Sequence, residues 1–554
     1  MKTNYSFYLY IFFLNFAVNG LVAQELNLKL NSLNKTDVTI LKKIDYQKKH
    51  KDSISIHKEI RSISNHLKKK GFFTNSFDSL SKQNKDYFAY FTLNEKIDRV
   101  IINLNKDIIE LFENFKIQNS SITIPIERIE KLLLDTSMEL DKKGKSFSKV
   151  KLVNTIIQGK KLFTEIEIYQ SEERTIDKTI TKGYSNFPKS FLKNYFNINA
   201  KTLFGQKTLN NISKASKSIS FIKEIKPPEI LFTKDSTILY LYFEKNKNNS
   251  FDGIVNFTSK ENGDGLLFNG NIDLKLNNTL NLGEKFEFLW NSANKKRSEF
   301  KIKTEIPYIF NSKISPEISF SIFKQDSTFL NTKFESNLFY NINGNSKIGI
   351  TYNSESSENL ETSIESNITS FHNYFMGFQY NYKISRNDVF LDDKINLAIN
   401  PSLGRRITEN SLNQFKIEIS ASYIYDINSR NSIFIQNKTG YLNSDSFVNN
   451  ELFRIGGANS IRGFNEQSIF ANSYSYLNLE YRYLTSVKSY FYTVSDFGNA
   501  KISSKDTFLI GLGIGYRFKT KNSLINLSTA LNKDGNSSFD FKKTQLLIGW
   551  TNYF

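Results

Sequence analysis

The stretch "FLIGLGIGYRF", residues 508–518, alternates between two kinds of side chain. Large apolar residues occupy every second position from Phe508 to Phe518, and the positions between them, such as Gly511 and Arg517, are mostly small or charged. Successive residues of a β-strand point to opposite faces of the sheet, so this pattern predicts a strand with one apolar face. The same period continues from about residue 248 to the last residue, which predicts an all-β second half.

This alternation suits either a soluble sandwich with an apolar core or a membrane barrel with an apolar outer face. Residues 249–554 hold about 16 such segments, roughly 19 residues for each strand with its connection, which suits membrane strands joined by short turns. The ending "LLIGWTNYF", with Gly549, Trp550 and the terminal Phe554, resembles the C-terminal aromatic signal by which outer-membrane barrels are recognised for insertion. We therefore predict a 16-stranded antiparallel transmembrane β-barrel over residues 247–554.

Aromatic residues at the predicted strand ends would form the interfacial girdles of such a barrel. The candidates are Tyr308, Phe310, Tyr425, Tyr483 and Tyr516.

The first 23 residues have the pattern of a secretory signal peptide. Lys2 precedes the apolar stretch "FYLYIFFLNFAVNGLV", and Leu21-Val22-Ala23 forms a small-residue cleavage site before Gln24. An uncleaved membrane anchor is the alternative. We expect an exported chain, and since no other window approaches the ~18 apolar residues of a membrane helix, any further span is expected to be β.

The overall composition excludes several classes of protein. The apolar fraction of 39% is too high for a disordered chain, whereas the mean hydropathy of −0.41 excludes a bundle of membrane helices. The net charge of +19 comes from lysines scattered among acidic residues, so no nucleic-acid partner is expected. The chain has no cysteine, which excludes disulfides and thiolate chemistry.

Residues 24–246 show mixed α/β patterns in three repeats of about 75 residues, each read as strand–helix–helix–strand–strand. The expected boundaries are 24–95, 96–170 and 171–246. In the first repeat, Ile56, Ile60, Ile63 and Leu67 form one helical stripe that ends at Gly71.

Three further expectations concern the boundary and the middle of these repeats. Segments 86–93 and 96–104 are expected to form a strand pair, a helix is expected to begin at Pro125, and a second helical stretch is expected at 148–157.

No catalytic or cofactor-binding constellation is evident. His57 and His66 are nine positions apart with no carboxylate pair at ligand spacing, which makes a zinc site improbable. The chain has no Gly-rich phosphate loop, nucleophile elbow or Cys/His dyad. We therefore expect no enzyme activity, no metal and no cofactor.

The segment "RIGGANSIRGF", residues 454–464, is too long and too rich in glycine for a turn between strands. It resembles the sixth-loop motif of the BamA/TamA superfamily, the bacterial surface antigen family of outer-membrane assembly factors. The matching residues are Arg462, Gly463 and Phe464, preceded by Gly456 and Gly457.

The resemblance implies that loop 451–472 folds back into the barrel lumen, where Arg462 meets carboxylates on the next two strands. The expected partners are Glu480 and Asp496, the latter in an Asp-x-Gly motif with Gly498. Alternation in the two predicted strands independently turns both carboxylates inward. The alternative is an ordinary extracellular loop with an incidental arginine.

The N-terminal repeats look like POTRA domains, the periplasmic modules of the same superfamily, and a count of three resembles TamA. The resemblance implies a non-enzymatic protein that helps other β-barrels fold and insert into the outer membrane. Its expected partners are unfolded outer-membrane proteins, membrane lipid and a periplasm-spanning protein or lipoprotein at the POTRA domains. Clients would join POTRA edge strands by β-augmentation and would pair at a weak seam between "NSFDGIVNF" (249–257) and "TQLLIGWTNYF" (544–554).

Two other functions stay open. One is a polypeptide or adhesin exporter of the two-partner secretion type, built on the same scaffold. The other is a passive porin or an enzyme carried on a barrel, which the repeats, the Arg-Gly-Phe loop and the lack of catalytic residues disfavour.

Overall fold

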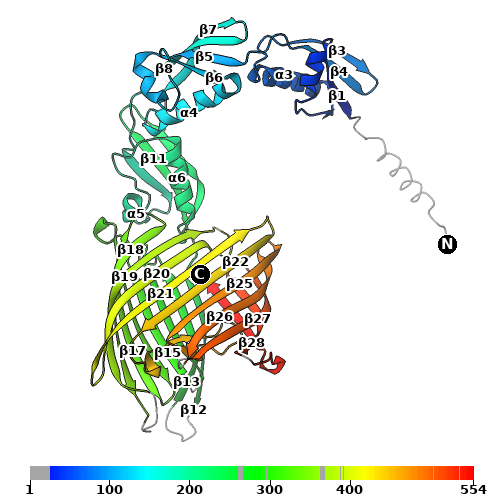
Figure 1. Ribbon diagram of the computed structural model, residues 1–554. Helices are drawn as coiled ribbons and strands as arrows, with labels where there is room; N and C mark the ends of the chain where they lie inside the picture. Colours follow the sequence, from blue (N-terminus) through cyan, green and yellow to red (C-terminus); the bar gives the residue numbers. More distant parts are fainter. Residues whose placement is uncertain are drawn as a thin grey trace, which may run out of the picture. The chain divides into compact units, whose positions relative to one another are not determined.

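The computed structural model describes residues 25–554, apart from 260–265, 295–296, 362–367, 387, 391, 503–504 and 536. The predicted signal peptide, residues 1–23, lies outside the described residues. The chain divides into two compact units: Met1–Arg174 with Leu203–Gln206, and Thr175–Thr202 with Lys207–Phe554. The first unit holds two α/β repeats, and the second holds a third repeat and a β-barrel (Figure 1).

The first repeat is a four-stranded sheet covered by a long helix. Its strands run in the order β2-β1-β4-β3. Helix α3 buries the predicted isoleucine and leucine stripe, its first turn is capped by Asp52, and Gly71 follows it with φ +99°. The elements are β1 (Leu26–Asn31), α2 (Lys35–Leu41), β2 (Lys49–His50), α3 (Ser53–Lys69), β3 (Ser76–Gln83) and β4 (Asp86–Thr92).

The second repeat has the sheet order β6-β5-β8-β7 and one long helix. The elements are β5 (Arg99–Asn103), η1 (Lys106–Phe112), β6 (Ser121–Pro125), η2 (Ile126–Arg128), α4 (Ile129–Lys142), β7 (Lys149–Gln158) and β8 (Lys161–Tyr169).

Two of the local predictions are wrong in these repeats. Segment 148–157 is strand β7 rather than a helix, because its Val and Ile residues pair antiparallel with β8 at a sheet edge. Segments 86–93 and 96–104 do not pair with each other. Strand β4 lies parallel to β1 and strand β5 lies parallel to β8, so the boundary between two repeats falls between them.

The third repeat is a three-stranded sheet, in the order β10-β11-β9, with two helices. Aromatic rings fill its core, where Phe187 contacts Phe191, Phe196, Phe221 and Phe243. The elements are β9 (Lys178–Gly183), α5 (Lys189–Asn194), α6 (Gln206–Lys217), β10 (Ile222–Phe232) and β11 (Thr237–Lys245).

The rest of the second unit is a closed antiparallel barrel of 16 strands, which confirms the predicted fold class and strand number. The strands are β12 (Ser250–Ser259), β13 (Leu266–Asn277), β14 (Lys285–Asn294), β15 (Arg297–Glu305), β16 (Ile314–Gln325), β17 (Phe329–Asn341), β18 (Ser346–Asn359), β19 (Phe371–Ser385), β20 (Asp393–Ile407), β21 (Ser411–Asp426), β22 (Asn431–Asn443), β25 (Ser473–Ser486), β26 (Ser489–Ile502), β27 (Lys505–Lys519), β28 (Ser523–Asp534) and β29 (Gln545–Tyr553).

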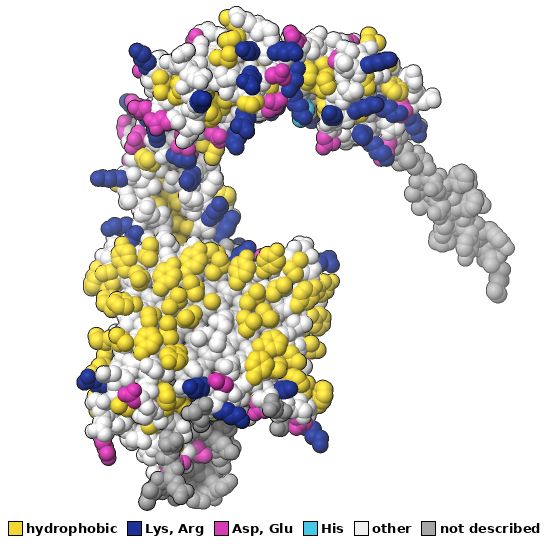
Figure 2. Space-filling model, in the orientation of Figure 1, with side chains coloured by type: hydrophobic (Ala, Val, Ile, Leu, Met, Phe, Trp, Pro, Cys, Tyr) yellow, Lys and Arg dark blue, Asp and Glu magenta, His cyan; other side chains and the backbone are white. Residues whose placement is uncertain are grey.

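The outer face of the barrel is apolar. On β27 the side chains of Phe508, Leu512 and Ile514 point outward, whereas Leu509 and Gly511 are buried on the lumenal side. Figure 2 shows hydrophobic side chains in a broad band over the face of the barrel in view, with charged side chains gathered near its ends. A band of this kind is the surface that a transmembrane β-barrel presents to lipid.

One predicted girdle residue has a different place. Tyr425 and Tyr483 point outward, but Tyr308 is 5% exposed and its ring packs edge-on against Phe191 of α5, with 5.0 Å between centroids. Tyr308 lies in the turn after β15, beside η3 (Ile309–Asn311), where the strand alternation no longer applies. The third repeat thus rests on a turn of the barrel.

The barrel closes through a short seam between its first and last strands. Strands β12 and β29 share two residue pairs, Ser250 with Tyr553 and Phe251 with Asn552, and the Phe554 amide also donates to the Asn249 carbonyl. The neighbouring hairpins are longer: β12 pairs with β13 over ten residues and β28 with β29 over eight. Within the described residues, the pairing of β12 with β29 is limited to these two residue pairs.

A candidate arginine lock in the barrel lumen

The connection between β22 and β25 enters the barrel. Residues 444–452 form its entry limb, with the short helix η4 (Asn449–Glu451). A small hairpin, β23 (Phe453–Ile455) and β24 (Ile469–Ala471), then carries a tip that contacts β25, β26 and β28 on the inner wall.

The predicted glycines shape this tip. Gly456, Gly457 and Gly463 have φ values of +104°, +102° and +93°, a region that favours glycine. At Gly463 an added Cβ would also lie 2.8 Å from the Leu531 carbonyl of the wall. The tip therefore combines sharp turns with a close approach to β28.

Two glycines of the barrel wall lie directly against the loop tip. An added Cβ at Gly498, on β26, would lie 2.6 Å from the Ile461 side chain. At Gly511, on β27, it would lie 2.2 Å from the Arg462 carbonyl oxygen. Gly498 belongs to the predicted Asp-x-Gly motif, whereas the sequence analysis gave Gly511 no role. Both glycines leave room for the backbone of the tip.

Arg462 lies between the two predicted carboxylates. Its Nε and Nη2 atoms donate to Asp496 at 2.9 and 2.7 Å, and its backbone amide donates to the same carboxylate at 2.9 Å. Its Nη1 atom donates to Glu480 at 2.5 Å. The exposed fractions of Arg462, Glu480 and Asp496 are 8%, 7% and 0%. We call these three residues the arginine lock.

The chemistry of the groups explains this arrangement. A guanidinium is planar and presents its N–H groups in a fork that matches a carboxylate, so Asp496 binds it through two parallel hydrogen bonds. Removing a charge from water costs several kcal/mol unless a partner compensates it. Each charge of the lock is compensated by another member, which holds the loop tip against β25 and β26.

The arginine lock continues into a longer chain of alternating charges. Arg482 donates to Glu480 at 2.8 Å through Nε and to Asp392 at 2.9 Å through Nη1. Asp392 also accepts from Arg517 at 3.3 Å. Asp392 precedes β20, in the connection that follows β19, on the end of the barrel where β12 starts and β29 ends. The chain thus joins the loop tip to a turn at that end.

The sequence analysis gave no role to Arg482, Asp392 or Arg517. No local pattern identifies Asp392, because its partners are 90 and 125 positions away and meet it only through barrel closure.

Phe464 is buried in the lumen. It belongs to an apolar cluster that joins the loop tip to the inner face of the barrel. The buried members of the cluster are Ile455, Ile461, Phe464, Ala471, Tyr476, Ala500 and Leu509.

The residues of the predicted insertion signal lie on the last strand and at its end. Trp550 and Phe554 are 57% and 52% exposed on the barrel's outer side. An added Cβ at Gly549 would come no nearer than 3.7 Å to Asn526, so packing does not require a glycine there. Recognition of this segment stays a prediction.

Within the described ranges, no group of three or more His, Asp or Glu side chains is placed to hold a metal ion. Nor does any helix in those ranges combine the length and the apolar character needed to cross a bilayer.

Comparison with known proteins shows a likeness over part of the barrel. Residues 268–518 match the family model described as haemolysin secretion/activation protein ShlB/FhaC/HecB. No curated protein sequence is a significant match.

Solved structures share the fold at low sequence identity. CdiB from Acinetobacter baumannii is 14% identical with a TM-score of 0.51, and the match covers 90% of this chain and 98% of CdiB. CdiB from Escherichia coli is 12% identical with a TM-score of 0.50, and the match covers 89% of this chain and 98% of that one. BamA from Haemophilus ducreyi lacking POTRA domains 1–3 is 13% identical with a TM-score of 0.47, over 83% of this chain and all of that one.

A closed 16-stranded barrel with an apolar outer face and a charged lumen defines an outer-membrane β-barrel protein. Residues 268–518 of this chain are similar to the haemolysin secretion and activation proteins, and its fold, a barrel preceded by POTRA-like repeats, is similar to that of CdiB. A particular closeness to TamA stays a prediction, because the matching family model is that of haemolysin secretion and activation proteins.

Proposed function

We propose that this protein helps other β-barrel proteins fold and insert into the outer membrane, and that the seam between β12 and β29 is where clients pair. The observation that carries the proposal is the two-pair seam. Unpaired N–H and C=O groups on a strand edge are a template for another strand, and within a bilayer water cannot satisfy them. A client hairpin that adds to the seam would satisfy these groups and its own.

The POTRA-like repeats offer further strand edges on the periplasmic side. Strand β7 is at the edge of its sheet, and its Ile156 and Ile157 are 56% and 48% exposed. An extended client segment can add to such an edge through main-chain hydrogen bonds, with side chains giving preference for apolar sequences. We propose that unfolded outer-membrane proteins are held in this way before they reach the seam.

In this mechanism the arginine lock keeps the loop tip on β25 and β26, which precede the seam strand β29 by four and three strands. The lock would hold these strands in a fixed shape while the seam opens beside them. No nucleotide or cofactor is required, since the client's own burial of apolar surface and pairing of its backbone would drive insertion.

Depletion of the protein in its native cells tests this function. We expect many outer-membrane barrels to decrease together when the outer-membrane proteome is quantified, and we expect Arg462→Ala, expressed at the native level, to reproduce part of that decrease. An unchanged set of barrels would contradict the proposal.

A second candidate function is export of a dedicated polypeptide through the lumen. The match to the model of haemolysin secretion and activation proteins favours it. A cavity of about 750 Å³ opens between the third repeat and the lumenal wall, lined by polar and charged side chains such as Lys303, Glu317 and Lys347. An exported chain entering there would pass Asp392 and then displace the loop tip. Loss of one secreted protein from the medium on depletion, with the barrels unchanged, would support this function instead.

A further inference from the structure

The entry limb of the loop, residues 444–452, has contacts of its own with the barrel wall. Glu451 forms a salt bridge with Arg406 of β20 and accepts a hydrogen bond from Gln414 of β21 at 3.0 Å. Arg406 also donates to the Ser446 hydroxyl at 2.7 Å. The Arg406 and Glu451 side chains are 3% and 1% exposed, so this ion pair is at least as buried as the arginine lock.

The neighbouring Asn450 extends these contacts to further strands of the same wall. Its side-chain amide donates to the Ser357 hydroxyl of β18 at 2.6 Å and to the Thr369 carbonyl at 2.9 Å. The backbone carbonyl of Asn450 accepts a hydrogen bond from the side-chain amide of Asn331, on β17, at 2.8 Å. The entry limb is therefore tied to β17, β18, β20 and β21, none of which takes part in the arginine lock.

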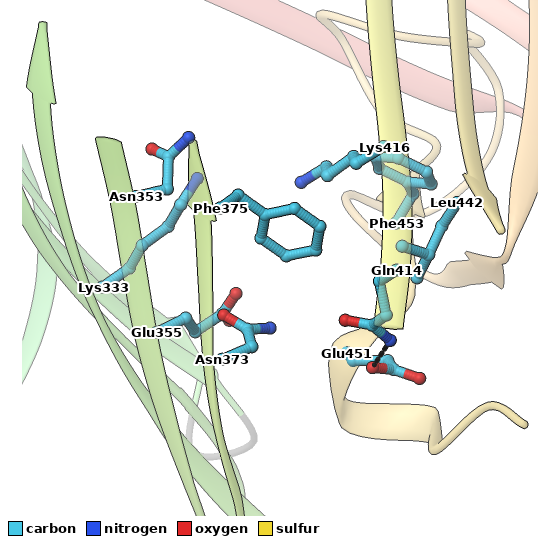
Figure 3. A pocket seen from close by; sticks show the side chains of 10 residues that line it. All are labelled: Lys333, Asn353, Glu355, Asn373, Phe375, Gln414, Lys416, Leu442, Glu451 and Phe453. Atoms are coloured by element: carbon cyan, nitrogen blue, oxygen red, sulfur yellow. Dashed lines mark hydrogen bonds between the residues drawn. The ribbon is translucent and has the colours of Figure 1, made fainter. Parts of the chain in front are cut away.

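Figure 3 shows the two sides of this contact. Gln414 and Glu451 are joined by a hydrogen bond, and Lys333, Glu355 and Asn373 stand on the strands that face them. The space between them is small, about 20 Å³, which is room for about one water molecule. The limb is packed against this wall rather than spanning an open gap.

The two ion pairs have opposite polarity. In the arginine lock the loop supplies the cation and the wall supplies the anions, whereas here the wall supplies Arg406 and the loop supplies Glu451. A buried charge that loses its partner is strongly unfavourable, so each pair resists release by itself. Because the pairs lie on different strands, movement of the wall at β25 and β26 need not disturb the pair on β20.

We propose that Arg406 and Glu451, with Asn450, form a second anchor that holds the entry limb in the lumen independently of the arginine lock. The loop then leaves the lumen only when both attachments release, and loss of the arginine lock alone frees the tip while the limb stays in place. The second anchor is a positioning device for the loop, whether the protein inserts barrels or exports a polypeptide.

Spin-label distance measurements on the full-length protein in lipid nanodiscs test this inference. Because the chain has no cysteine, introduced cysteines are labelled uniquely. One label pair, Asp445→Cys with Ser429→Cys, reports on the limb, and another, Asn459→Cys with Ser429→Cys, reports on the tip. Each pair is measured in the native background and in Arg462→Ala, Glu451→Arg and the charge swap Arg406→Glu with Glu451→Arg.

We expect Arg462→Ala to broaden the tip distances and leave the limb distances narrow, and Glu451→Arg to broaden the limb distances. The charge swap should narrow the limb distances again, which a loss of packing alone would not produce. Arg405→Gln is the matched control, since Arg405 is exposed beside Arg406 on the same strand, and it should change neither distribution.

The inference is overturned if Glu451→Arg leaves the limb distances as narrow as in the native protein, or if Arg462→Ala alone frees the limb. Should Glu451→Arg fail to give a heat-modifiable barrel on gels, Glu451→Gln replaces it, with the same two outcomes. Barrel-insertion activity does not enter this readout, so its result is independent of the proposed function.

Discussion

The lumenal arginine binds its two carboxylates unequally. Asp496 is fully buried and accepts three hydrogen bonds from Arg462, whereas Glu480 accepts one from Arg462 and keeps Arg482 as a second cation. Because a buried charge without a partner is costly, the loss of Asp496 leaves more of the Arg462 guanidinium uncompensated than the loss of Glu480 does.

We therefore expect Asp496→Asn to loosen the loop tip more than Glu480→Gln does. Removing one partner of a buried ion pair costs about 3–5 kcal/mol of folding stability. The loss of stability in Asp496→Asn should fall in this range, and the loss in Glu480→Gln should be smaller. The measurement is the temperature at which the band of the folded barrel disappears on gels, and this temperature should be lower for Asp496→Asn than for Glu480→Gln. Equal effects of the two lock variants would contradict the assignment.

Asp392 compensates two cations, Arg482 and Arg517, at the end of the charge chain. With Asp392→Asn those two guanidiniums share a site without their common anion, and like charges repel. We expect faster amide hydrogen exchange around residues 388–392 and, more weakly, at the loop tip. If hydrogen exchange becomes faster only in the turn and stays unchanged at the loop tip, the chain of charges does not couple Asp392 to the arginine lock.

Much of the arginine lock could be predicted from sequence, since the Arg-Gly-Phe resemblance and strand alternation together pointed to Arg462, Glu480 and Asp496. The contacts of Arg406 and Asp392 could not, because each joins strands and loops that are distant in sequence. Glu451, for example, is 45 positions from Arg406. Such contacts depend on strand order and register around the barrel, which residue types alone do not specify.

At the scale of strands, the alternation of apolar and polar residues was a reliable guide in the barrel and a poor one in the repeats. The same alternation recurs in all sixteen barrel strands, because each strand has one lipid-facing side. The strand prediction for any one segment is therefore supported by the pattern of the others. Segment 148–157 is a short stretch of mixed polar and apolar residues in which helix and strand periods are hard to tell apart, and pairing with β8 decides the outcome. Tyr308 was misplaced because a turn follows its strand.

Close packing of the loop on the wall gives a prediction for strand β27. Gly511→Ala would place a methyl group 2.2 Å from the Arg462 carbonyl, so the loop tip must shift. We expect the spin-label distances to the loop tip to have a broader distribution than in the native protein, as with Arg462→Ala. The matched control is Gly549→Ala on β29, where the nearest atom is 3.7 Å away and no change is expected. If the tip distances in Gly511→Ala stay as narrow as in the native protein, the close contact does not constrain the position of the loop tip.

At the scale of the whole molecule, the third repeat and the barrel form one compact unit, and the first two repeats form another. In the unit with the barrel, Phe191 packs on Tyr308, and the Tyr184 hydroxyl donates to Asn281 at 2.5 Å. Burial raises the pKa of Tyr195, which lines the cavity beneath the third repeat, to about 12. This repeat is thus held against the lumen entrance.

The central claim is that clients enter the membrane through the β12–β29 seam. The most direct measurement closes that seam with a disulfide between Phe251→Cys and Asn552→Cys, which are paired residues on adjacent strands. The protein is placed in liposomes, and the folding rate of an unfolded outer-membrane barrel is measured before and after reduction. Tyr340→Cys with Ile348→Cys, a pair on β17 and β18, is the control. We predict that the seam disulfide lowers the rate to that of protein-free liposomes and that reduction restores it, whereas the control pair has no effect. An undiminished rate with the seam closed would contradict the account.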